Sequence, residues 1–335
     1  FTNLDSLVCG MNQLESIDLS GNTRLQFLDV SKNKLQTLDL EPCADLRYLK
    51  CSGNQFETID LSHSKALRRL DCSSNKLVSL SLAANDALDS LACFSNKLTS
   101  LDLSKNAGLR YLICNNNQIA SFDLSVCPKL YTLICHDNKV EALDISHNPE
   151  LYELECYSMG LTSLDISKNG KLGKLTCSFN NLTSLDTHRN PLLTKLLVGF
   201  NKQLSSLDVS GNPGLLDLEL QSCPIEKLDI SGCHQLKQLS AQFAKLTSID
   251  ISGNPELTDL NCSGNQLVAV DLSGFKSYTG YVSNNSRTVD VVDDNKLDLT
   301  TLAPYGFDVS RASKWTGGTL EGNILTFTAD KVTYY

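Results

Sequence analysis

The sequence predicts a curved solenoid of thirteen stacked coils, mostly β with little helix, whose short strands form a parallel sheet on the concave face. Three observations predict this fold class. Cysteine recurs every 21 residues from Cys51 to Cys177. Leucine stands five and two residues before every position of this series, and asparagine stands three residues after ten of the thirteen. A fixed period of this length indicates a solenoid, because a single coil cannot bury its own apolar face.

The recurring position contributes one residue to each coil, and we call it the cysteine column. Nine of its thirteen residues are cysteine. One extra residue within 200–204 shifts the column positions of the last three coils by one residue. The column consists of Cys9, Val30, Cys51, Cys72, Cys93, Cys114, Cys135, Cys156, Cys177, Val198, Leu220, Ala241 and Cys262.

Each coil is expected to begin with a strand that ends at this column. In "YLICN", Leu112 and Cys114 alternate with Tyr111, Ile113 and Asn115, so the first pair faces inward and the other three face outward. The segment 109–119 reads L-x-x-L-x-C-x-x-N-x-I and resembles the leucine-rich repeat, apart from its cysteine. This resemblance covers about residues 4 to 274 and implies an α/β-class leucine-rich repeat solenoid with a right-handed stack.

The cysteine column has three possible interpretations. In-register strands hold neighbouring Cβ atoms about 4.8 Å apart, whereas a disulfide requires about 3.8 Å and a crossed geometry. A buried thiol otherwise behaves as a small hydrophobic group, and it fits a narrow coil better than a third leucine. We therefore favour a column of free, inert and buried thiols. The alternatives are disulfides within the column and a metal or redox role.

Four further cysteines lie off the column. Cys43, Cys127 and Cys233 stand where the second half of a coil normally has asparagine, and Cys223 stands at the first asparagine site. We expect the asparagines to point inward and satisfy backbone groups, which a thiol can partly imitate as a weak donor. Cys233 and His234 could suggest zinc, but no further ligand pair lies nearby in the sequence. The sequence therefore predicts no metal and no cofactor.

The combination of 21-residue repeats and a cysteine column is similar to the internalin J subclass of bacterial internalin-like surface proteins. This resemblance implies an extracellular or cell-surface location and an adhesin-like role, although the chain shows no export signal. The chain opens at Phe1 inside an already patterned segment, so we expect a processed or trimmed fragment.

A second recurring residue is aspartate in the box L-D-[LIV]-S, which we call the aspartate stripe. Its carboxylates should point outward on the face opposite the sheet. They could accept N–H or hydroxyl hydrogen bonds from the next coil, which we favour, or be solvated and screened, or bind calcium. The stripe comprises Asp18, Asp39, Asp60, Asp102, Asp123, Asp144, Asp165, Asp186, Asp208, Asp229, Asp250 and Asp271.

A binding surface is expected on the variable outward positions of the sheet, because the leucine frame is committed to folding. The middle coils place aromatic and aliphatic side chains there, bounded by charges, which is typical of a protein-binding surface. The alternative is that these side chains only support the sheet by cross-strand contacts. The candidate partner-binding residues are Phe94, Tyr111, Ile113, Ile134, His136, Glu153, Glu155 and Tyr157.

Composition excludes several classes of function. The formal net charge of −9 argues against a nucleic-acid partner, and no apolar run approaches the roughly 18 residues of a membrane span. The five histidines fall at unrelated places in the repeat, so no catalytic constellation can be assembled. We therefore expect a non-enzymatic, monomeric protein-binding module. The alternative is a carbohydrate-binding or cell-wall-associated structural protein.

The repeat pattern ends at about residue 274, which divides the chain into a solenoid, 1–274, and a β-rich C-terminal cap, 275–335. "YVSNNSRTVDVV" (281–292) and "LTFTADKVTYY" (325–335) alternate with the two-residue period of strands. A solenoid needs such a cap because its end exposes core and a sheet edge. Trp315 is expected in the core of this cap rather than as a platform for sugar.

Overall fold

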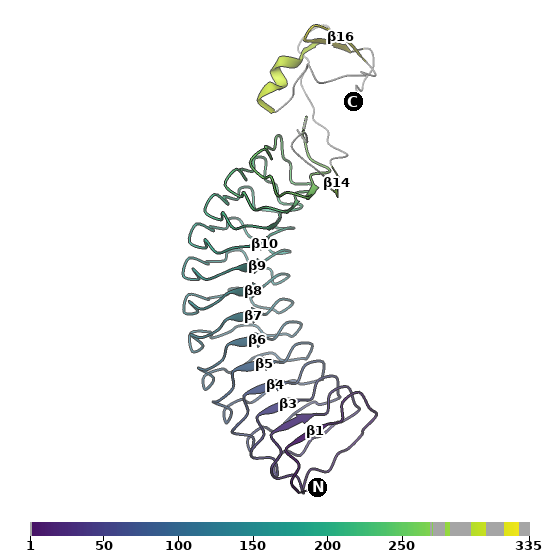
Figure 1. Ribbon diagram of the computed structural model, residues 1–335, viewed down its shortest axis with the longest axis vertical. Helices are drawn as coiled ribbons and strands as arrows, with labels where there is room; N and C mark the ends of the chain where they lie inside the picture. Colours follow the sequence, from purple (N-terminus) through teal and green to yellow (C-terminus); the bar gives the residue numbers. More distant parts are fainter. Residues whose placement is uncertain (1, 269, 271–278, 282–295, 306–317, 328–335) are drawn as a thin grey trace.

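The computed structural model describes residues 2–268, 270, 279–281, 296–305 and 318–327, and it forms a curved stack of coils (Figure 1). Each of the thirteen expected coils contributes one three-residue strand, which confirms the predicted solenoid. The strands are β1 (Ser6–Val8), β2 (Phe27–Asp29), β3 (Tyr48–Lys50), β4 (Arg69–Asp71), β5 (Ser90–Ala92), β6 (Tyr111–Ile113), β7 (Thr132–Ile134), β8 (Glu153–Glu155), β9 (Lys174–Thr176), β10 (Lys195–Leu197), β11 (Asp217–Glu219), β12 (Gln238–Ser240) and β13 (Asp259–Asn261).

These strands form one parallel sheet in which sequence order equals spatial order. Most pairs keep the 21-residue step, as in Leu112↔Leu133. Between β10 and β11 the step is 22, with Leu196 opposite Leu218, which places the extra residue in a loop without disturbing the ladder. A fourteenth strand, β14 (Thr279–Tyr281), pairs in parallel with β13.

The core lies directly behind the sheet. The central leucine of β2 to β13 is buried, and the residue of the cysteine column that follows each of these strands is buried as well. Twelve of the thirteen cysteines are buried free thiols, whereas Cys9 is half-buried. Burial raises the pKa of Cys93 to about 12, because a thiolate would lose its hydration there. The prediction of buried thiols is therefore confirmed.

The asparagines that follow the cysteine column hold neighbouring coils together, and we call them the first asparagine ladder. Asn138 shows the pattern: its Oδ1 accepts a hydrogen bond from the Ile119 N–H at 3.0 Å. Its Nδ2 donates to the carbonyl oxygens of Cys114 at 3.1 Å and Cys135 at 2.9 Å. The inward ladder predicted from the sequence therefore satisfies backbone groups on two coils at once.

Cysteines that replace asparagine partly imitate this role, as predicted. The Sγ of Cys127 donates to the Asn106 carbonyl at 3.6 Å, and the Sγ of Cys43 donates to the Asn22 carbonyl at 3.9 Å. The second series of asparagines is less complete than we expected. Asn148 donates twice through Nδ2, but its buried Oδ1 has no partner.

Beyond the solenoid, a small antiparallel sheet has the strand order β15-β17-β16. It consists of β15 (Lys296–Asp298), β16 (Gly318–Glu321) and β17 (Ile324–Phe327), with the 3-10 helix η1 (Leu299–Tyr305) after β15. The β-rich C-terminal part agrees with the expected cap, whereas the boundary at 274/275 stays a prediction. Trp315 and most of 281–292 lie outside the described residues. Within the described part, no helix has the length and apolarity required to cross a membrane.

Candidate functional site

The outward side chains of the sheet, together with the residue after each column position, make up the strand face. On β6 and β7 this face presents Tyr111, which is 37% exposed, and the half-buried Ile113 and Ile134, which stand opposite each other in the parallel register. Thr132, between Tyr111 and Glu153 in the register, is buried. The predicted aliphatic pair therefore forms one continuous apolar strip across two coils.

Aromatic rings border this strip where the chain enters the strands. Tyr131 and Tyr152 stack with ring centroids 5.3 Å apart and nearly parallel planes. Tyr111 meets Tyr131 edge-on at 6.1 Å, and the guanidinium carbon of Arg110 lies 5.6 Å from the Tyr111 ring centroid. Sequence reasoning missed Tyr131 and Tyr152 because they precede the strands. The available signal was two tyrosines at the same register of consecutive coils.

On the other border, His136 and Tyr157 form a stacked pair with ring centroids 3.8 Å apart. The Tyr157 hydroxyl lies 3.0 Å from His136 Nε2, and His136 Nδ1 lies 2.8 Å from Asp137 Oδ2. His136 is only 8% exposed, so it supports Tyr157 from below rather than presenting an open face as expected. Sequence analysis also missed Asp137, whose left-handed backbone, with φ 53°, accompanies this contact.

This hydrogen-bonded chain gives a histidine both an orienting carboxylate and a hydroxyl partner, which the sequence search did not find. Burial, followed by the charges of Asp137 and Glu155, raises the pKa of Tyr157. The phenol therefore stays protonated and is a poor nucleophile at neutral pH. The stacking and the hydrogen bond to His136 hold the Tyr157 ring in one position.

The remaining predicted residues lie at the edges of this surface. Glu153 on β8 receives a hydrogen bond and an ion pair from Lys174 on β9, with Nζ 3.3 Å from Oε1. Glu155 stands beside Ile134 in the register, and Phe94 is half-buried one coil before Tyr111. All eight predicted residues thus lie on consecutive coils of one face, with charges where the apolar strip ends.

The opposite face carries the aspartate stripe, and here the expected hydrogen bonding needs a correction. In all eleven described members, Oδ1 accepts the backbone N–H of the residue two places later in the same coil, at 2.9 to 3.1 Å. The bond is local because the chain turns sharply after the aspartate, as short polar side chains favour. One contact does cross coils, from His188 Nε2 to Asp208 Oδ2 at 3.3 Å.

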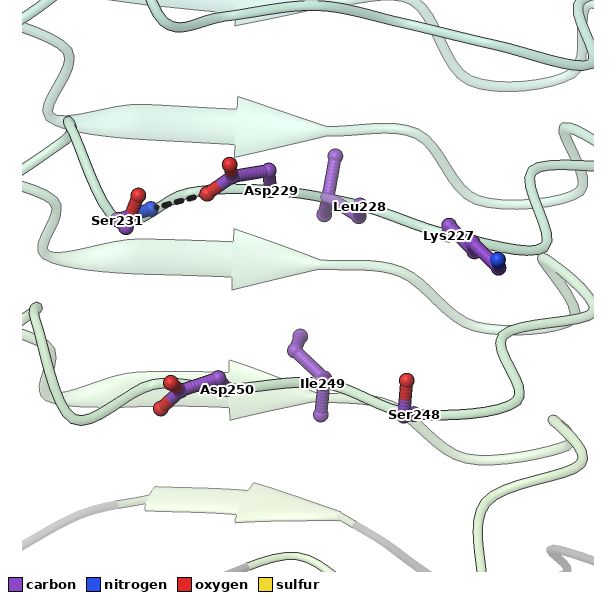
Figure 2. Close-up of a pocket in the computed structure, with 7 residues that line it drawn as sticks. All are labelled: Lys227, Leu228, Asp229, Ser231, Ser248, Ile249 and Asp250. Atoms are coloured by element: carbon purple, nitrogen blue, oxygen red, sulfur yellow. Dashed lines mark hydrogen bonds between the residues drawn. The ribbon is translucent and has the colours of Figure 1, made fainter. Parts of the chain in front are cut away.

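A shallow pocket also lies on the aspartate stripe rather than on the strand face. Figure 2 shows Asp229 and Asp250 at equivalent places on neighbouring coils, with the Ser231 N–H donating to Asp229. It is lined by residues 227–229, 231 and 248–250 and contains none of the predicted binding residues. Within the described ranges, no group of three or more histidine, cysteine, aspartate or glutamate side chains is arranged to hold a metal ion.

Comparison with solved structures shows that this geometry is similar to that of internalins. No family model matches the chain, and no curated protein matches it. The functional domain of InlJ from Listeria monocytogenes, described as including a cysteine ladder, superposes with a TM-score of 0.86 at 29% identity over 99% of this chain and 78% of that domain.

Two more distant structures share the fold. The internalin InlF from Listeria monocytogenes gives a TM-score of 0.77 at 21% identity, covering 83% of this chain and 86% of InlF. YopM from Yersinia enterocolitica gives a TM-score of 0.70 at 24% identity, covering 84% of this chain and 60% of YopM. The repeat length, the buried cysteine column and the InlJ match agree. The chain is therefore a leucine-rich repeat protein with a buried cysteine column, similar to the internalin InlJ domain.

Proposed function

We propose that this protein is a non-enzymatic, adhesin-like module that binds a protein partner on the strand face of its middle coils. The observation that carries the proposal is the half-exposed strip of Ile113 and Ile134 between two rigid aromatic borders. Tyr111, Tyr157 and this aliphatic pair are the anchors, and Phe94, His136, Glu153 and Glu155 complete the surface. Tyrosine and aliphatic groups inside a polar rim are the usual composition of a protein interface.

The arrangement of the anchors supports a preformed site. Tyr157 is fixed by stacking on His136 and by the hydrogen bond to its Nε2, and Tyr111 packs against Tyr131. Side chains that are already ordered lose little conformational entropy when a partner docks, which increases the net affinity. The aliphatic pair favours a protein over a sugar at this place, because sugars are recognised by aromatic faces and polar groups.

A cell-surface or secreted location is part of the same proposal. Its support is the similarity to the InlJ domain and to other internalins. The twelve buried thiols remove the conflict between a high cysteine content and an oxidising environment. Burial raises the pKa of the column thiols, that of Cys93 to about 12, so they resist oxidation without a reducing compartment.

The test is a pull-down from host and bacterial surface extracts with three forms of the chain. The Tyr111→Ala/Tyr157→Ala variant should lose the captured partner, with affinity reduced by about a hundredfold for two hot-spot side chains. The matched control is Phe27→Ala/Tyr48→Ala, which removes another aromatic pair of the same sheet, with ring centroids 6.2 Å apart. Equal capture by all three forms, with unchanged melting temperatures, would refute the strand-face site.

A further inference from the structure

A different aromatic feature lies where each coil turns away from the sheet, two residues after the cysteine column. All thirteen residues at this turn have a left-handed backbone, with φ between 52° and 69°. That conformation disfavours side chains with a Cβ, and bulky ones most of all. Most coils place glycine, serine, asparagine or aspartate there. Three coils near the C-terminal end of the solenoid instead place phenylalanine, at Phe179, Phe200 and Phe243.

These three residues form an exposed surface feature that we call the phenylalanine ridge. Phe179 is 53% exposed, Phe243 is 64% exposed, and Phe200 is half-buried. The rings of Phe179 and Phe200 stack with centroids 4.2 Å apart and planes within 12°. A bulky residue that is both strained and exposed gains little from the core, so its place in the chain calls for a function.

The ridge contains a gap of one coil. Ser222 occupies the turn between Phe200 and Phe243, so these two positions are two coil steps, or about 10 Å, apart. Backbone hydrogen bonds fix the spacing, from Phe200 N–H to Gln221 O at 2.7 Å and from Ser222 N–H to Gln242 O at 2.8 Å. Phe179 covers one face of the Phe200 ring, so a ring placed above Ser222 would stack on the other face of Phe200 at about 3.5 to 4 Å.

The Phe243 ring leaves this gap open. A Cβ placed on Gly264 would collide with the Phe243 ring, which shows that the ring lies over the following coil, away from Ser222. The glycine at position 264 is therefore required for this orientation. The floor of the gap is the small hydroxyl-bearing Ser222, which is only half-buried.

Neutral amides flank the gap on the side of the sheet. Gln221 Nε2 donates to Glu219 Oε1 at 2.8 Å, which leaves the Gln221 Oε1 as an acceptor. Ser240 Oγ donates to Gln242 Oε1 at 2.7 Å, which leaves the Gln242 Nε2 as a donor. An acceptor and a donor on neighbouring coils match the paired hydroxyl groups of a sugar. The aromatic face of Phe200 beside them matches its C–H surface.

We propose that the phenylalanine ridge is a second binding site, separate from the strand-face site, and that it takes a neutral carbohydrate with one sugar ring above Ser222, stacked on Phe200. This inference does not rest on the proposed protein partner. The two sites use different coils and different side chains, so each can fail without the other.

The test uses an array of neutral oligosaccharides with terminal mannose, galactose or N-acetylglucosamine, followed by titration of the best ligand. Phe200→Ser should lower the affinity by at least about tenfold, the loss of one stacking face. Phe243→Ser should have a smaller effect, because that ring lies over the following coil. Both variants should fold, because the chain already has serine with the same backbone at positions 74, 95, 158 and 222. Ser222→Phe should also abolish binding by filling the gap.

Two controls make the result specific. Met11→Ser changes an exposed apolar residue at the same turn of the first coil, and it should leave sugar binding unchanged. The Tyr111→Ala/Tyr157→Ala variant should also bind the sugar normally. The proposal is overturned if the wild-type chain binds no neutral sugar, if the ridge variants bind as well as wild type, or if they lose only a protein ligand.

Discussion

Replacement of Asn138 by alanine removes one member of the first asparagine ladder at a place where its neighbours compensate only in part. Asn138 is 8% exposed and bonds the Ile119 N–H, the Cys114 carbonyl and the Cys135 carbonyl. After the change, Cys114 O still accepts from Asn117 Nδ2 at 3.1 Å. Cys135 O loses its ladder donor, because the next coil has Met159 at the asparagine position.

The expected cost follows from the number of buried groups left without a partner. Two buried groups, the Ile119 N–H and the Cys135 carbonyl, lose their hydrogen-bond partner, and each such loss costs about 1 to 3 kcal/mol. After partial relaxation, the free energy of unfolding should fall by roughly 2 to 4 kcal/mol. Asn117→Ala is the matched control. It orphans only the Leu98 N–H, because Asn96 still bonds Cys93 O and Asn138 still bonds Cys114 O. Its cost should be about half as large.

The measurement is urea unfolding of both variants, supported by hydrogen exchange at the Ile119 amide, because a repeat protein can open locally. Met159→Asn added to Asn138→Ala should recover part of the loss by restoring a donor to Cys135 O. The reasoning is refuted if the two single variants lose equal stability, or if Asn138→Ala leaves exchange at Ile119 unchanged.

Three further predictions concern the thiols, the aspartate stripe and calcium. At pH 8 an alkylating reagent should modify at most Cys9 in the native protein and all thirteen cysteines in urea. The reason is that a pKa of about 12 in place of 9.0 lowers the thiolate fraction of Cys93 roughly a thousandfold. Prompt labelling of several cysteines in the native protein would contradict this. The Ser167 N–H and hydroxyl hold the pKa of Asp165 below its ordinary value of 3.8. This lowered pKa stabilises the folded state above pH 3.8, and the stabilisation is lost as the pH falls through the lowered pKa. The urea midpoint should therefore drop between about pH 5 and 3. A flat profile would count against the local hydrogen bonds. Calcium should leave the melting temperature unchanged, because each stripe carboxylate already accepts a local N–H; a rise with calcium that EDTA reverses would restore the calcium interpretation.

The candidate site was predicted in outline because a strand alternates its side chains with a period of two. Once Cys114 is placed inside, Tyr111 and Ile113 must face outward, and the register of the repeat brings Ile134 beside Ile113. The sequence could not show that His136 lies beneath Tyr157, because ring stacking depends on side-chain rotamers rather than on register. It also gave no reason to select Asp137, which belongs to the turn and not to the strand.

By itself, the sequence determined the coil, its thirteen repeats, the buried column of thiols and the inward asparagines, since each follows from a fixed period and from the need to bury apolar groups and satisfy polar ones. Only the tertiary structure showed that the stripe carboxylates accept hydrogen bonds within their own coil, and which asparagine oxygens have no hydrogen-bond partner. It alone revealed the left-handed turns that expose Phe179 and Phe243 and leave Phe200 half-buried. Those features depend on backbone angles and on contacts between coils, and a one-dimensional pattern of residue types does not specify either.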